Sequence, residues 1–181
     1  NSSKSNSLYF NKCFKRSASG DNSSSPVTVA VGTKSNPFVG VFDENGKTLY
    51  VNISDTENQG TAPFRTIARN EYSNSCEIKN LTVTGNVTGA TYAAGLVGFC
   101  NGSIYNCCSI NNCKVDVNVS VPASSGDCTM GGVIGYINSS GVNLQNVIFS
   151  GTMDNKTGYA GGLAGWSTNT CCLNINNYLT T

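Results

Sequence analysis

The chain has 181 residues, of which 39% are hydrophobic and 12% are charged, and its formal net charge at pH 7 is +1. The low charge argues against a nucleic-acid-binding surface, which needs clustered Lys and Arg residues. No apolar run reaches the ~20 residues that a membrane-spanning helix needs. The length suits one domain. Because Asn1 opens a polar stretch rather than a secretory signal, we expect the chain to begin after processing or to be a segment of a longer protein.

Residues 1–25 are predicted to form an irregular N-terminal arm with a short strand. Ser and Asn dominate this segment, and apolar side chains that can pack are concentrated at 8–10. Its basic residues Lys12, Lys15 and Arg16 are interpreted as a solvated patch, because so few charges produce a weak field.

Residues 26–75 are predicted to form lead-in strands and a capping coil. Val alternates with other residues over 27–31, as in a strand. Asn45-Gly46 is a turn signal between two strand-like runs. The acids before it superficially suggest a calcium loop, but the full ligand spacing is absent and a plain turn is favoured. Residues 62–67 are interpreted as a degenerate copy of the repeat that follows.

A Gly-rich pattern recurs at 93–99 (AAGLVGF), 130–136 (MGGVIGY) and 160–166 (AGGLAGW), and its copies start 37 and then 30 residues apart. A pattern that returns at such intervals is typical of a solenoid. Glycine packs nothing in a strand, so its return in every unit indicates corners or close backbone contact between stacked coils. The alternative is a β-sandwich whose Gly-rich strands are coincidental.

A second pattern, aliphatic-x-Asn-apolar-x-apolar, recurs in phase with the first. It is found at 78–83, 110–115 and 144–149, and the beginning of a further copy is found at 175–179. We therefore expect residues 76–181 to form stacked β-solenoid repeats with equivalent strands paired. The positions predicted to point inward are Ile78, Leu81, Val83, Ile110, Val115, Leu144, Val147, Phe149 and Ile175, with Leu96, Val133 and Leu163 in one column. The residues predicted to form a ladder of bonded amides at a coil corner are Asn80, Asn112, Asn146 and Asn177.

N-linked glycans are expected because the chain has nine Asn-x-Ser/Thr triplets, more than its composition predicts. The predicted glycosylation sites, at loops or outward strand positions, are Asn52, Asn86, Asn101, Asn118, Asn138 and Asn155. A ladder residue such as Asn80 cannot carry a bulky sugar. The alternative is that an Asn- and Thr-rich solenoid produces the triplets by accident. No cofactor other than these glycans is expected.

Nine cysteines predict a disulfide framework in a secreted chain. The candidates are Cys13, Cys76, Cys100, Cys107, Cys108, Cys113, Cys128, Cys171 and Cys172. Because their number is odd, at least one is free or is bonded to another chain. Zinc is disfavoured as the reason for the cysteines, since the chain has no His and no Cys-x-x-Cys pair.

The Gly-rich pattern resembles the GLUG motif, named for its Gly-Leu-aliphatic-Gly core. In that family an Ile-x-Asn-Cys segment follows, as at 104–107 here, and a lead-in similar to residues 31–49 precedes, usually with Gly where Glu44 stands. The resemblance covers roughly residues 26–179. It implies an all-β fold, a right-handed parallel β-helix, on secreted or surface-anchored proteins, and supplies no catalytic residues. The cysteine and triplet counts exceed those expected of bacterial members and favour a eukaryotic secretory route.

We expect an extracellular or cell-surface structural protein, a glycosylated, disulfide-stapled β-solenoid that assembles into or decorates a fibre or surface coat. The expected partner is the protein itself in a head-to-tail homo-oligomer or filament, because an uncharged strand edge at 176–181 recruits other strands. The alternative is an adhesin module that binds a glycan or protein ligand through its lateral face. An enzyme is not expected, since Asp116, Asp127 and Asp154 lie far apart in the repeat and there is no His.

Overall fold

The computed structural model describes residues 14–15, 22–69, 76–102, 107–122, 128–156, 158–168 and 170–181. Its regular elements are strands, and the pairings between them are parallel. The strands are β1 (Phe14–Lys15), β2 (Gly40–Gln59), β3 (Phe64–Arg69), β4 (Cys76–Thr91), β5 (Ala93–Ala94), β6 (Val97–Gly102), β7 (Cys107–Val121), β8 (Thr129–Gly131), β9 (Ile134–Asn138), β10 (Gly141–Phe149), β11 (Met153–Asn155), β12 (Tyr159–Gly161), β13 (Ala164–Ser167) and β14 (Cys172–Thr180).

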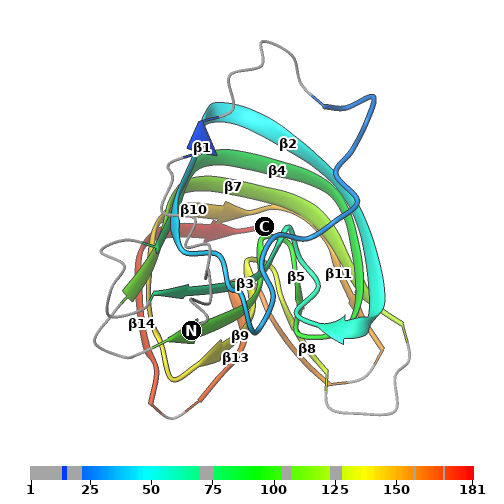
Figure 1. Ribbon diagram of the computed structural model, residues 1–181. Coiled ribbons are helices and arrows are strands. Elements are labelled where there is room, and N and C mark those ends of the chain that lie inside the picture. The colour runs from blue at the N-terminus through cyan, green and yellow to red at the C-terminus, as the bar shows by residue number, and fades with distance from the viewer. Residues whose placement is uncertain are drawn as a thin grey trace, which may run out of the picture.

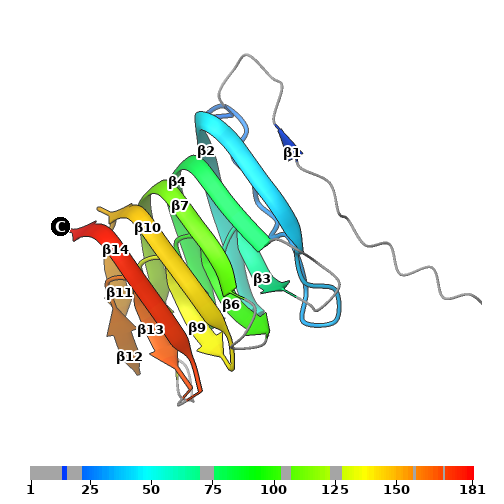
Figure 2. The same cartoon turned by 90° about the vertical axis from the view of Figure 1, so that its left-hand side faces the viewer.

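The strands stack as the coils of a β-solenoid, so the expected fold class, a parallel β-helix, is confirmed. The long sheet has the order β1-β2-β4-β7-β10-β14, and the two short sheets have the orders β12-β8-β5 and β13-β9-β6-β3. Seen along the stack, the long strands arch over the two short sheets (Figure 1). Seen from the side, β2 lies toward one end and β14 at the other (Figure 2).

The core contains the apolar positions that the repeat predicts. Eight of the nine residues predicted to point inward, all except Ile175, are at most 3% exposed. Leu96, Val133 and Leu163 are buried and joined by backbone bonds from Leu96 N and Val133 N to the next coil, which confirms their single column. Ile175 is 41% exposed although it is in register with the buried Leu144, because β14 is the last strand of its sheet.

The recurring glycines lie where backbones of neighbouring coils approach closely. A Cβ on Gly132 would come within 2.1 Å of the Gly162 carbonyl oxygen and 2.6 Å of the Phe149 ring. One on Gly135 would come within 2.4 Å of the Tyr92 oxygen. Neither glycine has a positive φ, so close packing and not backbone conformation requires it, as the sequence pattern indicated.

The first coil corrects one prediction and confirms another. Asn45-Gly46 does not separate two strands, because β2 continues through it. The pair has φ values of 58° and 77° and lies within a register shift between Asp43 and Lys47, so it is a bulge at a coil corner. The degenerate copy at 62–67 is confirmed by register, since Phe64 pairs with Val97 and Thr66 with Phe99.

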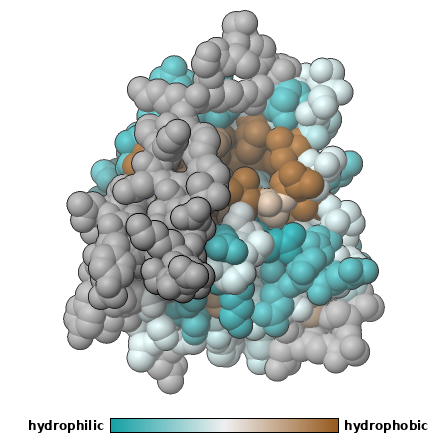
Figure 3. Space-filling view, viewed as in Figure 1, coloured by the Kyte–Doolittle hydropathy of each residue, from teal (hydrophilic) through white to brown (hydrophobic). Residues whose placement is uncertain are grey.

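Residues 22–39 cross the N-terminal end of the stack and touch the first coil through single bridges from Val27, Val31 and Phe38. Apolar surface gathers in the middle of this end (Figure 3), and Val29 and Val31 are among its exposed residues, at 71% and 48%. Most of the expected N-terminal arm, including residues 8–10, lies outside the described residues. Within the described ranges, no helix has the length and apolarity to cross a bilayer.

Candidate functional site

The predicted amide ladder exists and runs along one corner of the solenoid. Asn112 donates to Asn80 over 3.3 Å, Asn146 to Asn112 over 2.8 Å, and Asn177 to Asn146 over 3.1 Å, each from Nδ2 to Oδ1. All four residues have φ between 51° and 54°, a left-handed conformation that Asn tolerates better than most residues. The Asn residues therefore serve two purposes, since they turn the backbone and bond neighbouring coils.

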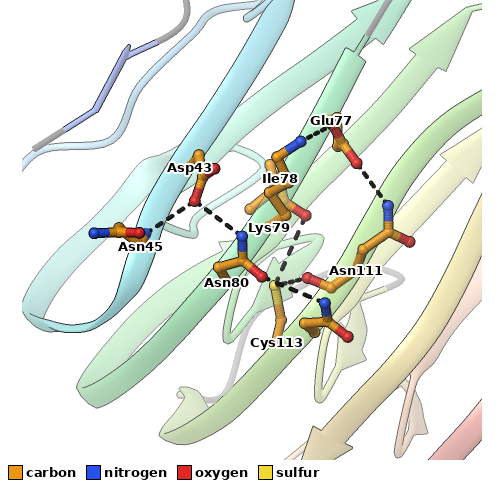
Figure 4. A network of polar contacts seen from close by, with 9 residues as sticks. Asp43, Asn45, Glu77, Ile78, Lys79, Asn80, Asn111 and Cys113 are labelled. Carbon is orange, nitrogen blue, oxygen red and sulfur yellow. Dashed lines mark hydrogen bonds and ion pairs between the residues drawn. The ribbon is translucent and has the colours of Figure 1, made fainter.

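The ladder begins on an acid that the sequence analysis did not include. Asn80 Nδ2 donates to Asp43 Oδ1 over 3.0 Å, and Asp43 Oδ1 also accepts the backbone N–H of Asn45 (Figure 4). Beside it, Asn111 Nδ2 donates to Glu77 Oε1 over 2.8 Å, and the other oxygen of Glu77 pairs with Lys79. In the register of β2 and β4, Asp43 pairs with Lys79 and not with Asn80, and a bulge follows it. Alignment of the repeats therefore does not place Asp43 at the ladder.

A groove of about 510 Å³ follows the ladder across four coils. Asn45, Asn80, Asn112 and Asn146 line it, and Lys114 and Ile148 flank it. Its lining is mainly amide and aliphatic, so the groove offers hydrogen bonds to a polar chain but holds no cluster of acids and bases. Among the described residues, no group of three or more His, Cys, Asp or Glu side chains is arranged to hold a metal ion.

The aromatic residues that end the Gly-rich motifs form a column on the outside of β6, β9 and β13. Phe99, Tyr136 and Trp166 are in register. The rings of Phe99 and Tyr136 are parallel within 2° at a centroid distance of 5.4 Å, and Tyr92 packs 4.5 Å from Tyr136. Burial, and secondarily the nearby Tyr136, raises the pKa of Tyr92. These ring faces contact each other, so the column stabilises the stack and offers mainly ring edges to a ligand.

The column ends in a more exposed pair. Tyr159 and Trp166 lie 4.8 Å apart between centroids and are 53% and 44% exposed. They belong to β12 and β13, the last strands of the two short sheets. We call the end of the stack that β12, β13 and β14 form the C-terminal face. Its exposed large side chains are Tyr159, Trp166, Ile175, Tyr178 and Leu179.

Three predicted glycosylation sites fall in one column. Asn52, Asn86 and Asn118 are exposed and in register on β2, β4 and β7. Asn118 Nδ2 donates to Asn86 Oδ1, and the triplet hydroxyls of Thr88 and Ser120 lie 2.9 Å apart. The triplets therefore coincide with hydrogen-bonded columns. A solenoid whose Asn, Ser and Thr residues serve only to bond neighbouring coils would contain the same triplets, so both the glycosylation hypothesis and its alternative stay open.

The other three predicted sites also have hydrogen-bond partners. Asn138 Nδ2 donates to Asn101 Oδ1 over 3.1 Å, and Ser140 of the same triplet is buried. Asn155 Nδ2 donates to the Tyr159 carbonyl. All three side chains are half-buried, so a sugar there has less room than at Asn52.

The seven cysteines with described side chains are thiols, and no two of them are bonded. Five are buried, Cys171 is half-buried and Cys172 is exposed. The disulfide framework stays a prediction, because Cys13 and the side chain of Cys107 lie outside the described residues. A hydrogen bond with the Cys108 thiol, together with complete burial, raises the pKa of Cys100 well above its usual value. Cys100 and Cys108 therefore form a buried thiol pair. The Sγ of Cys100 also lies 3.4 Å from Ser140 Oγ.

Comparison with known proteins found no match: no family model, no curated protein and no solved structure is similar to this chain. The resemblance to the GLUG motif therefore stays an expectation from the sequence.

Proposed function

We propose that the protein is an extracellular structural module, a β-solenoid rod that joins other β-coils end to end and so forms or decorates a fibre or surface coat. The observation that carries this proposal is the C-terminal face. Ile175 and Tyr178 occupy positions that are buried in every inner coil, yet they are 41% and 59% exposed. Beyond β14, no further strand of the described chain pairs with its backbone, and such an edge recruits strands.

The placement of the acids supports a structural rather than a catalytic role. Asp55 pairs with Arg65 and Asp154 with Lys156. Asp43 and Glu77 end amide columns. General acid–base catalysis needs such groups converging on one pocket, whereas here each stabilises its own part of the rod. The N-linked glycans and the disulfides belong to this proposal as features of an extracellular rod.

Sedimentation velocity over a range of concentrations, with electron microscopy of the same samples, tests end-to-end joining. We expect species that grow with concentration and rods longer than one molecule. Tyr178→Lys should weaken this association, because it places a charge on the C-terminal face. Ile148→Lys, on the lateral surface of β10 and 37% exposed in the native protein, is the matched control. A monomer at every concentration would refute self-assembly.

A second candidate is the adhesin, and the exposed Tyr159–Trp166 pair is the observation that favours it. An aromatic pair of this kind offers ring surface to a glycan or a protein side chain. Binding of the protein to a glycan array, and its loss in Trp166→Ala, would support this function. Unchanged binding by Trp166→Ala would remove the pair from consideration.

A further inference from the structure

The side-chain amide columns share one direction along the rod. Eight side-chain amides of the described residues donate to a side chain of the neighbouring coil on the N-terminal side. The donors are Asn80, Asn111, Asn112, Asn118, Asn138, Asn146, Asn174 and Asn177. The columns are therefore polar, with a donor side and an acceptor side.

In two of the columns an acid at the N-terminal end fixes this direction. A carboxylate has oxygens but no N–H, so Asp43 can only accept, and Asn80 must turn its Nδ2 toward it. The Oδ1 of Asn80 then faces the next coil and requires a donor, which Asn112 supplies. The same reasoning applies through Asn146 to Asn177. Glu77 sets the direction of the neighbouring column through Asn111 in the same way.

At the columns of Asn177 and Asn174 the C-terminal face consequently presents side-chain acceptors. Asn177 and Asn174 use Nδ2 to bond Asn146 and Asn143. The Oδ1 atoms of Asn177 and Asn174 accept no hydrogen bond from the described residues, and both side chains are exposed. A strand that stacks here is stabilised if it brings an N–H over Asn177, and destabilised if it brings a second acceptor.

We propose that the C-terminal face binds a parallel β-strand that carries Asn over Asn177 and apolar residues over Ile175 and Tyr178, from a coil of the same aliphatic-x-Asn-apolar pattern. This inference rests on the proposed end-to-end joining and specifies the partner. The amide continues the ladder, the apolar residues cover the exposed side chains, and the strand backbone pairs with β14.

The N-terminal end of a second copy meets these requirements less well than a strand that carries Asn, so the self-association expected above is the weaker of the two joints. Beside the ladder position it presents the carboxylate of Asp43, whose Oδ1 already accepts two hydrogen bonds and which carries no proton to donate at pH 7. In addition, β1 pairs with β2 at Phe42 and Asp43, so that edge is occupied. A head-to-tail joint would require β1 to leave β2 and would place a carboxylate against the Asn177 oxygen.

A peptide-binding experiment tests the proposal directly. The probe is a fluorescently labelled peptide with the sequence of residues 139–153, which contains the ladder Asn146, added to the 181-residue protein. Its Asn146→Asp variant should bind at least about tenfold more weakly at pH 7, because an acceptor then meets the Asn177 oxygen. Gln145→Asp is the matched control, since it adds the same charge beside the ladder, and it should change affinity less than about threefold.

Two further readouts locate the effect. Hydrogen exchange should show protection of the β14 amides when the parent peptide binds. At pH 3 the Asn146→Asp peptide should recover affinity, because a protonated carboxyl donates a hydrogen bond. Equal binding of the Asn146→Asp and parent peptides, protection away from β14, or no binding of the parent peptide would each overturn the proposal. Concentration-dependent rods that form while both peptides bind equally would leave end-to-end joining intact and refute only the donor requirement.

Discussion

Asn80 Nδ2 lies 3.0 Å from Asp43 Oδ1, and this bond joins the first two coils across 37 positions of sequence. It is the first contact of a ladder that continues through Asn112 and Asn146 to Asn177. Because Asp43 cannot donate, the bond gives the ladder its direction. The stability of the rod and the proposed strand binding at Asn177 thus depend on the same column.

Replacing an inner ladder residue by an acid should destabilise the fold. Asn112→Asp removes the donation to Asn80 and places a carboxylate against the Asn80 oxygen, so we expect the free energy of unfolding to fall by about 1–2 kcal/mol at pH 7. Asp tolerates the left-handed backbone. Asn143→Asp is the control, because Asn143 only accepts, from Asn174, and its loss should stay below about 0.5 kcal/mol. Urea denaturation measures both, and equal losses would contradict the directional ladder.

A methyl group on the inner motif glycine should be poorly tolerated. In Gly132→Ala the added Cβ meets the Gly162 carbonyl and the Phe149 ring, so we expect a loss of about 3 kcal/mol or more. In Gly162→Ala, at the same position of the next coil, the nearest atom is the Thr180 methyl at 2.9 Å. Thr180 is an exposed side chain that can rotate, so this control should lose less than half as much. Thermal unfolding of the two variants measures both losses of stability. Equal losses would contradict this prediction and would show that the inner coil shifts to make room for the methyl group.

The triplets at Asn52, Asn86 and Asn118 should not all carry sugars at once. Their strands are neighbours, spaced about 4.8 Å apart, and Asn86 lies between the other two. We expect glycan at Asn52 and an unmodified Asn86. Mass spectrometry of peptides before and after enzymatic deglycosylation measures occupancy at each site. Full occupancy of all three would contradict the crowding argument, and no mass change would refute glycosylation altogether.

Cysteine chemistry distinguishes the expected disulfides from the thiols of the structure. The disulfide prediction expects thiol titration of the denatured protein to find one free thiol or none. In the reduced folded protein, burial raises the pKa of Cys113 to about 12, so alkylation of Cys113 at pH 8 should be far slower than that of the exposed Cys172. A majority of free thiols in natively purified material would argue for a reducing compartment and against the extracellular proposal.

The Asp55–Arg65 pair should make part of the stability depend on acid pH. Partial burial opposes ionisation of Asp55, but hydrogen bonds from the Asn58 backbone and the Arg65 guanidinium outweigh it and lower the pKa to about 2. A depressed folded pKa stabilises the fold above the unfolded value near 4, and this contribution is lost as the pH falls toward 2.

We therefore expect Asp55→Asn to cost about 1 kcal/mol at pH 7 and almost nothing at pH 2. Asp154→Asn, which removes an exposed pair with Lys156, should have little effect at either pH. Denaturation curves at both pH values test this, and a pH-independent loss would assign the effect to packing.

Much of the fold follows from periodicity in the sequence. The return of Gly-rich and aliphatic-x-Asn segments predicts parallel coils in register, and Leu96 over Val133 follows from alignment alone. The same alignment predicts the ladder, because equivalent positions of stacked coils must meet. The exposure of Ile175 was not predictable from the pattern. The repeat pattern shows that the side chain points toward the core, but it does not show whether another coil covers that side chain.

The sequence by itself determined the repeat, its register and the residues of the ladder, because these depend only on spacing along the chain. Tertiary structure decided the direction of the ladder, since that direction depends on Asp43, which is in register with Lys79 and reaches the ladder only through its side chain. It also decided that Cys100 meets Cys108. Cys100 pairs with Ile137 and Cys108 with Val142, so the two thiols are not equivalent positions of the repeat, and spacing along the chain does not predict that they meet.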